Sequence, residues 1–576
     1  MQTELRRTWG RRAHGAHRRV LPATTHRRAL SVLVRATALK DNRKPRVVVV
    51  GGGWAGFGAA HALQQAGADV VVLDSAPNPG GLASAWKSAG GRTVEPGIKG
   101  FWYQYANIFS LVDSLGVRDA FTDWTQSSFY SPEGLLVRSP ILQREPRLPT
   151  PLGSFLYTAP YFTRLPLADR LSALPLLGPL LEYSADQEAY DAYDKMSALE
   201  LFRAAGVSSR LYRQFLEPML LVTLFAPGHK LSAAAALDAL YYFALAHQAD
   251  FDVRWCRGSV SERLLTPWAA ALRARGAVLL GGRRVEALEE APQGGRPGRL
   301  VSVGPDGSRE SWSADAVVFA VGSSAMARLA AASPPLAAQP LFAGFANLGS
   351  VDVAAVRLWL GSRLRPATPS NVLAGFEPGA GATLFHLSEL QDEYRSDTSG
   401  GSVVEADLYH AASLLPLSDQ QLVDRVVDRM LPAVDPSTPR PRVLDASVLR
   451  FRGAVSLFSP GCASYMPTCR TPYDGVFMAG DWIRQGPGTH GAKGLCQEKA
   501  YVTGLQAGNL AAESVGLRRR AVVLPCEPDE SHIAAGREAA AALRRLGGQL
   551  GGALRGALPG GGRSLPEPLG GFTLLR

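Results

Sequence analysis

The sequence predicts an α/β protein in which a discontinuous nucleotide-binding domain is interrupted by a helical domain and by a mixed or antiparallel sheet. Three observations support this prediction: a glycine-rich turn between a strand and a helix near residue 50, a proline- and leucine-rich stretch between residues 131 and 250, and a second strand, glycine turn and helix near residue 480. Strands that alternate with helices favour a parallel, Rossmann-like sheet. A chain of 576 residues with 46% apolar composition can build two or more such lobes.

The first signature is the stretch RVVVVGGGWAGFGAAHALQQAGADVVVLD, residues 46–74. Four valines predict a buried strand, the glycines a tight turn, residues 59–66 a helix, and residues 70–73 a second strand. A diphosphate would meet the N–H groups at the helix N-terminus, and the acid that ends the second strand can bond ribose hydroxyls. The alternative is an ordinary strand–turn–helix connection. The residues predicted to bind the nucleotide here are Gly51, Gly53, Trp54, Ala55, Gly56, Asp74 and Ser75.

The formal net charge of +11 is located in the first 46 residues, which hold 13 Arg or Lys against Glu4 and Asp41. The rest of the chain is neutral, so nucleic acid is not an expected partner. An Arg-rich leader with few acids is typical of an organellar transit peptide, which we place at residues 1–44. We expect a plastid (chloroplast) location, with a mitochondrion as the alternative.

The composition also limits membrane and metal functions. No stretch of 18 or more apolar residues occurs, so we expect no membrane-spanning helix. The five cysteines form no CxxC pair and no zinc spacing, and we therefore expect neither a metal site nor a disulfide framework. A reducing interior is the compartment that fits this cysteine usage.

A further glycine-rich loop follows the second strand. The segment SAPNPGGLASAW contains Gly80 and Gly81, the glycines at 90 and 91 predict a hairpin turn, and residues 108–115 predict an amphipathic helix. A Glu-Pro-Gly turn, which ends at Gly97, lies between them.

This order of glycine turn, strand-ending acid, double glycine, tryptophan, Glu-Pro-Gly turn and aromatic patch resembles the plant and algal phytoene desaturases. They belong to the larger amine-oxidase-like group of flavoproteins. The resemblance implies that Gly80, Gly81, Leu82 and the backbone near Gly97 lie along a flavin. The chain departs from the family at Asp74, where Glu is usual, and at Leu82, where a basic residue is usual.

Residues 131–250 have a different composition, with many prolines and leucines and few charged residues. One interpretation is a pair of core helices broken by Pro175 and Pro179. The other is a monotopic patch that dips into a bilayer and admits an apolar substrate. The resemblance to the desaturases implies a helical substrate domain with an apolar tunnel for an acyclic polyene. The leucines concerned stand at positions 165, 167, 171, 174, 176, 177, 180 and 181.

The α/β texture then returns. A helix over residues 261–273, a strand over 278–280 and a last buried strand within 314–322 are expected to complete the nucleotide-binding lobe. The resemblance implies that the backbone of Val285 holds the adenine.

Residues 341–458 alternate between polar and apolar side chains, as in an antiparallel sheet. The amphipathic segment 417–434 predicts a helix that covers this sheet. In related flavoproteins such a sheet forms the floor of the substrate cavity.

The second signature is TPYDGVFMAGDWIRQGPGTHGAKGLCQEKAYVTGLQAGNLAAES, which predicts a buried strand over 475–479, a glycine-rich loop and a helix over 492–513. An acid after the strand can accept a hydrogen bond from a ribityl hydroxyl, and the new helix N-terminus can stabilise negative charge on a flavin. A simple NAD enzyme needs no such element, so the pair of signatures predicts FAD. The residues predicted to contact it here are Gly480, Asp481, Gly491 and Ala492.

His490 stands where many members of the family have Glu. We interpret it as a loop residue with local hydrogen bonds, and alternatively as a proton donor that faces the flavin. No segment resembles the cysteine motif that ties flavin covalently in monoamine oxidases. The resemblance therefore implies non-covalent FAD.

The resemblance covers residues 47–513 and implies an FAD-dependent oxidoreductase that oxidises an apolar substrate by hydride transfer to flavin, with quinone or oxygen as the final acceptor. Three alternatives use the same fold: an amine or porphyrinogen oxidase, a polyene isomerase that uses reduced flavin, and an inactive flavoprotein that serves as a binding factor. Peripheral membrane contact is a further expectation.

The glycine-rich end of the chain predicts a flexible tail, with a weak basic surface contact around residues 533–546 as the alternative. The expected divisions are therefore 1–44 transit peptide, 45–130, 251–330 and 466–516 FAD-binding domain, 131–250 helical substrate or membrane-contact domain, 331–465 substrate-domain sheet, and 517–576 flexible tail.

Overall fold

The computed structural model describes residues 43–78, 80–88, 90–290, 297–395, 400–485 and 491–557, with side chains to residue 546. All the elements below lie in one compact unit, Lys44–Arg576. The predicted transit peptide lies outside the described residues except for its last two positions, and His490 lies outside them as well.

A five-stranded parallel sheet forms the centre of the nucleotide-binding lobe, and its strand order is β19-β13-β1-β2-β9. Successive valines of β1 point to opposite faces, so Val47 and Val49 pack under α1 and α19, while Val48 and Val50 pack toward α12. Both faces are covered, which explains the unbroken run of valines. The bounds are β1 Arg46–Val50, β2 Asp69–Leu73, β9 Val278–Leu280, β13 Ala316–Phe319, β19 Val476–Met478, α1 Trp54–Ala66, α12 Ser323–Ala332 and α19 Gln497–Ser514.

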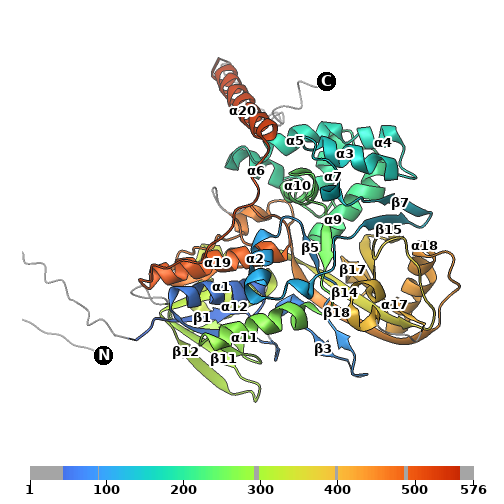
Figure 1. Ribbon diagram of the computed structural model, residues 1–576. Helices are drawn as coiled ribbons and strands as arrows, with labels where there is room; N and C mark the ends of the chain where they lie inside the picture. The colour runs from blue at the N-terminus through green and yellow to red at the C-terminus, as the bar shows by residue number, and fades with distance from the viewer. Residues whose placement is uncertain are drawn as a thin grey trace, which may run out of the picture. The chain divides into compact units, whose positions relative to one another are not determined.

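Figure 1 shows α19 lying along α1, although the two helices are more than four hundred residues apart in the sequence. Smaller elements border this lobe: an antiparallel sheet β10-β11-β12 and two short antiparallel strand pairs. Their bounds are β10 Arg284–Leu288, β11 Arg299–Val303, β12 Arg309–Ser313, β3 Trp86–Lys87 with β4 Thr93–Val94, β5 Gly100–Trp102 with β8 Val253–Trp255, α2 Ala106–Leu115, α11 Thr266–Ala274, α13 Pro334–Ala337 and α14 Pro340–Ala343.

A seven-stranded sheet, β18-β14-β17-β16-β15-β6-β7, forms the second lobe. Its strands pair antiparallel except for β15 and β6, so the sheet is mixed, as predicted. The predicted amphipathic segment covers it, with Leu422, Val426 and Met430 in the same core as the strands. The bounds are β6 Ser127–Ser131, β7 Gly134–Arg138, β14 Gly349–Leu360, β15 Ser370–Glu377, β16 Ala380–His386, β17 Ser402–Tyr409, β18 Val443–Leu457, α15 Leu387–Leu390, α16 Asp392–Arg395, α17 Asp419–Arg425 and α18 Leu431–Val434.

The helical region lies between β7 and β8 in the sequence (Figure 1). The interpretation of its leucines as core residues is wrong for Leu167, Leu171 and Leu174, which are exposed, while Leu176 and Leu180 are buried. No helix of the described ranges is both long enough and apolar enough to cross a bilayer. The bounds are α3 Leu152–Thr158, α4 Leu167–Leu171, α5 Leu177–Glu182, α6 Gln187–Asp194, α7 Ala198–Ala204, α8 Ser209–Leu211, α9 Glu217–Leu224 and α10 Ala233–Leu240.

The prediction of a flexible tail is wrong over much of its length, because Ser531–Ala557 form the helix α20. Tertiary contacts with the helical region outweigh the weak helix propensity of the glycines. Arg544 lies 3.2 Å from Glu182 of α5, and the Arg537 guanidinium lies 4.4 Å from the ring centre of Tyr241. Figure 1 shows α20 projecting from the end of the helical region beside α5.

Candidate functional site

A cavity of about 550 Å³ lies where the parallel sheet, the helical region and the seven-stranded sheet meet. Most of the predicted nucleotide-binding residues share its wall, whereas Gly56, Val285, Gly491 and Ala492 do not. The residues brought together are Gly51, Gly53, Trp54, Ala55, Asp74, Ser75, Gly80, Gly81, Leu82, Gly97, Gly480 and Asp481.

The glycine turn after β1 has no space for a side chain at Gly51 or Gly56. Gly51 has φ +103°, and a Cβ built there would lie 2.4 Å from the carbonyl oxygen of Ala320. A Cβ on Gly56 would lie 1.8 Å from the carbonyl oxygen of Gly51. Gly56 therefore packs behind the turn and supports its conformation, although it does not itself line the cavity. The backbone of Gly53 and that of Gly81 in the next loop face each other across the cavity wall. A flat, charged ligand can therefore reach the N-terminus of α1.

The helices α1 and α19 are in direct backbone contact. A Cβ on Gly504 would lie 2.1 Å from the Ala55 carbonyl oxygen, and one on Gly508 would lie 2.6 Å from that of Ala59. A Cβ on Gly58 of α1 would likewise lie 2.7 Å from the carbonyl oxygen of Tyr501 in α19. The close contact holds the starts of both helices against one cavity.

Asp74 ends β2 and holds the glycine turn. Its Oδ2 accepts from the N–H of Gly52 at 2.6 Å, and its Oδ1 accepts from the N–H of Ala76 at 2.7 Å. Burial raises the pKa of Asp74, and the two backbone donors oppose this shift. Each carboxylate oxygen keeps a second lone pair for a ligand hydroxyl.

Asp481 follows β19 and is surrounded by protein except where it meets the cavity. Burial raises its pKa to about 6, and the positive charge of Lys499 opposes this shift. Gly480 before it has φ +147°, and its backbone is held by Thr503 of α19, whose Oγ1 lies 3.0 Å from both its N and its O.

The predicted start of the second helix is wrong, since α19 begins at Gln497 and not at residue 492. Cys496 caps it, and its Sγ accepts from the N–H of Lys499 at 3.3 Å. The side chains in the wall are consequently those of Leu495, Cys496 and Gln497, none of which is among the predicted cofactor-binding residues.

Glu498 in the first turn of α19 also positions α2. Its carboxylate accepts from the N–H of Asn107 at 2.8 Å and from that of Ile108 at 3.0 Å. Burial raises its pKa to about 7, against the opposing effect of these donors. A helix without a side-chain cap of its own thus obtains one from the far end of the sequence.

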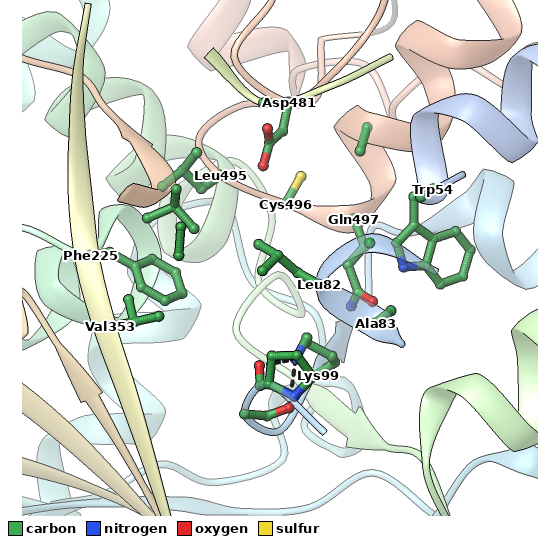
Figure 2. A pocket seen from close by; sticks show the side chains of 18 of the residues that line it. Trp54, Leu82, Ala83, Lys99, Phe225, Val353, Asp481, Leu495, Cys496 and Gln497 are labelled. Carbon is green, nitrogen blue, oxygen red and sulfur yellow. Dashed lines mark hydrogen bonds between the residues drawn. The ribbon is translucent and has the colours of Figure 1, made fainter. Parts of the chain in front are cut away.

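The opposite end of the cavity is lined mainly by apolar side chains, although the same elements also contribute a few serines and threonines. Figure 2 shows Phe225, Val353 and Leu495 grouped on one side, Trp54 on the other, and Leu82 between them. Phe225 has φ +61°, which is rare for a bulky residue, and its ring lies edge-on to Tyr409 with 4.9 Å between ring centres. Nothing in the sequence of this segment marks such a conformation. The apolar wall includes Phe129, Met219, Val222, Phe225, Phe251, Val372, Phe385 and Leu408.

The site fits a dinucleotide cofactor with a conjugated head group. Glycine backbones provide the close approach, and the half-buried carboxylate of Asp481 follows β19. Two polar atoms in the wall, Trp54 Nε1 and Gln497 Oε1, have no hydrogen-bond partner among the described residues. The fold and this two-part site define an oxidoreductase that binds a flavin dinucleotide.

The chain belongs to the family of flavin-containing amine oxidoreductases, whose family model matches residues 54–507. FAD is accordingly its cofactor, and the chain is an FAD-dependent oxidoreductase. The residue-by-residue assignment of the FAD site remains a prediction.

Among curated proteins, the chain is similar to a probable zeta-carotene desaturase of Synechococcus elongatus, with 26% identity over 76% of this chain and 94% of that protein. It is 29% identical to a carotenoid phi-ring synthase of Streptomyces griseus, over 82% and 89% of the two chains. It is 24% identical to a chloroplastic/chromoplastic 15-cis-phytoene desaturase of Solanum lycopersicum, over 76% and 74%.

Solved structures share the fold at low sequence identity. Cyclohexylamine oxidase from Brevibacterium oxydans superimposes with a TM-score of 0.61 at 15% identity, over 82% of this chain and 100% of that one. A putrescine oxidase bound to putrescine gives a TM-score of 0.56 at 16% identity, over 83% and 100%.

Proposed function

We propose that the enzyme oxidises an apolar, unsaturated hydrocarbon, a polyene of the class that carotene and phytoene desaturases act on. The main support for this proposal is the apolar end of the cavity, where phenylalanine and aliphatic side chains from α9, β6, β15, β16 and β17 line the wall. Such side chains bind a hydrocarbon mainly through the burial of apolar surface. The similarity to three carotenoid enzymes supports the same substrate class.

Bound FAD supplies the acceptor for an allylic hydrogen that leaves with its electron pair, while a neighbouring hydrogen would leave as a proton to a base or to water and a new C=C bond would form. The chain's own part is to hold and shield the reactants. The Gly51–Gly53 turn and the start of α1 would bind the diphosphate, Asp481 would accept from a ribityl hydroxyl, and Asp74 from a ribose hydroxyl. Electrons would then pass to a quinone or to oxygen.

The test is anaerobic mixing of the FAD-loaded enzyme with acyclic polyenes, amines and porphyrinogens in separate experiments. We expect polyenes to bleach the flavin absorbance and to yield a product with a longer conjugated system. Bleaching by amines or porphyrinogens instead would contradict the proposal. Product formed from a polyene without flavin bleaching would indicate isomerisation. Neither bleaching nor product with any of the three substrate classes would indicate a binding role.

We also propose that the enzyme meets a bilayer through α3, α4 and the turns around them, because its substrate would dissolve there. Seven large apolar side chains of this stretch are exposed, and Leu167 is the most exposed at 59%. So many neighbouring apolar side chains mark an interaction surface. The set is Leu152, Phe155, Leu156, Tyr161, Leu167, Leu171 and Leu174.

A plastid location is part of the same proposal, since the similar plant desaturases carry chloroplastic names and the first 46 residues hold the Arg-rich leader. A fluorescent protein fused after residue 50 should accumulate in plastids. Accumulation in mitochondria would contradict this part alone.

A further inference from the structure

Three carboxyl groups and two cations are buried together below the Gly97 turn, at the floor of the cavity. Glu95, Glu405 and Asp407 are 2%, 1% and 6% exposed, and Arg357 is 2% exposed. Lys99 completes the group, and what it exposes faces the cavity. With every group ionised this cluster would carry a net negative charge, which is costly in a dry interior. One bound proton would make it neutral.

The two cations are already engaged. The Arg357 Nε donates to Glu405 Oε2, its Nη1 donates to the carbonyl of Thr93 at 2.8 Å, and its Nη2 lies 3.9 Å from Glu95 Oε1. Lys99 Nζ donates to the carbonyl oxygens of Pro96 and Gly97, at 2.5 and 2.6 Å. Neither cation makes a direct ion pair with Asp407 among the described residues.

Glu405 and Asp407 lie two residues apart on β17, so their side chains point to the same face. Asp407 Oδ2 accepts from the N–H of Ile98 at 2.8 Å. Glu405 Oε1 and Asp407 Oδ1 have no hydrogen-bond donor among the described residues, yet the two carboxyl groups are within hydrogen-bonding reach of each other. Since ionised carboxylates only accept, a contact between them requires a proton.

We propose that Glu405 and Asp407 share one proton, and that this pair exchanges it with solvent as the charge on the bound FAD changes. Asp407 lines the cavity, and a Cβ on Gly97, which is predicted to lie along the flavin, would lie 2.7 Å from its Oδ2, so the pair adjoins the predicted flavin position. At a pH where the oxidised enzyme has lost the shared proton, the entry of an electron pair into the cavity restores it, and a solvent proton forms an O–H bond on Asp407. When the electrons leave, that bond breaks and the proton returns to solvent.

The surroundings agree with a bound proton. Burial and the negative charge of Glu405 raise the pKa of Asp407 well above its usual value, against the opposing effects of Lys99 and of the Ile98 N–H. Burial also raises the pKa of Glu95 to about 7, with Lys99 and Arg357 opposing. The remaining titratable groups that face the cluster are the hydroxyls of Tyr394 and Tyr409 and the thiol of Cys256 beside Glu95. Burial raises the pKa values of all three, so none supplies a negative charge at neutral pH.

The test uses the full chain loaded with FAD and no substrate, so its result does not depend on the proposed substrate class. The flavin midpoint potential is measured between about pH 6 and pH 10. In the wild type we expect a pH window in which one additional proton is taken up per electron pair, which steepens the slope by about 30 mV per pH unit. Asp407→Asn places a neutral amide of the same size there and should remove this window.

Glu377→Gln is the matched control, because Glu377 is a buried carboxyl of β15 that pairs with Arg425 and Arg429 outside the cavity wall. It should keep the wild-type slope. Equal slopes in the wild type and Asp407→Asn would overturn the proposal. If Asp407→Asn does not retain FAD, infrared difference spectra of wild-type enzyme with ¹³C-labelled aspartate decide: a protonated carboxyl band that changes on reduction supports the shared proton, and its absence overturns it.

Discussion

The two ends of the cavity are built in different ways. At the cofactor end, close backbone contacts fix the shape of the wall, and single methyl groups at Gly51, Gly56 or Gly504 would come within 2.4 Å of a carbonyl oxygen. The substrate end is made of side chains from strands and helices of several separate segments. Because backbone cannot adapt to added atoms and side chains can repack, the cofactor end should tolerate almost no change, whereas the substrate end should change its selectivity without loss of FAD.

The largest effect is expected at Gly56. Gly56→Ala places a methyl group 1.8 Å from the Gly51 carbonyl oxygen and must displace the turn. We expect FAD binding to be lost and the free energy of unfolding to fall by about 3 kcal/mol. Flavin absorbance after reconstitution and urea denaturation measure the two quantities.

Gly178→Ala in α5 is the matched control, since nothing lies within 4 Å of the added methyl group. It should bind FAD normally and be unchanged or slightly more stable. Normal FAD binding by Gly56→Ala would show that the turn is not the close contact described above.

A smaller effect is expected at Asp481. Asp481→Asn removes the negative charge that would accept from a ribityl hydroxyl, and FAD affinity should fall about 10- to 100-fold. Asp474→Asn serves as control, because Asp474 is exposed, lies at the other end of β19 and is not part of the cavity wall, and it should leave the affinity unchanged. Equal dissociation constants for both variants, measured by fluorescence titration, would remove Asp481 from the FAD site.

Asp481 also predicts a pH dependence of the FAD-free protein. Its folded pKa, about 6, is raised above the unfolded value, so the folded state holds the proton more tightly. This contribution to stability is fully present below the unfolded pKa, near 4, and is lost as the pH rises to about 6. Thermal unfolding of the wild type should therefore show a decline over this window that Asp481→Asn lacks.

At the substrate end, Phe225 should affect selectivity and not FAD binding. Its φ of +61° strains a bulky residue, and glycine adopts this conformation freely. We expect Phe225→Gly to be about 1 kcal/mol more stable than Phe225→Ala, and both to accept bulkier substrates with unchanged FAD affinity. Loss of FAD from either variant would contradict the division of the cavity into two ends.

The smallest effect on the fold is expected at the exposed leucines. Leu167→Glu combined with Leu171→Glu should change stability by less than about 0.5 kcal/mol, because both side chains are exposed. Sedimentation with lipid vesicles should fall strongly. Unchanged sedimentation would exclude this surface as the bilayer contact.

The cofactor end could be predicted from the sequence because its backbone conformation is determined within short, continuous segments. The run of valines, the spacing from Gly53 to Asp74 and the strand before Gly480 each depend on neighbours in the sequence. The start of α19 was predicted five residues too early because Gly491 and Ala492 continue the loop, and the cap is Cys496, a residue rarely used as one.

The substrate end could not be predicted in the same way. Phe225 lines the wall in a strained backbone conformation that no sequence motif predicts. The helix α20 forms because side chains such as Arg544 make ion pairs with α5, which is distant in the sequence. A signal did exist for the proton-sharing pair: Glu405 and Asp407 interrupt the apolar strand SVVEADLY at alternate positions, which places two acids on one buried face.

The most direct test of the central claim, that the turn after β1 and the start of α19 jointly hold one FAD, is the flavin content of the purified chain from Arg43 onward after reconstitution. We predict one FAD per chain, released intact on denaturation, and we predict that Gly504→Val, which separates α1 from α19, abolishes it. Retention of FAD by Gly504→Val, or a wild-type chain that carries NAD(P) and no flavin, would contradict the account.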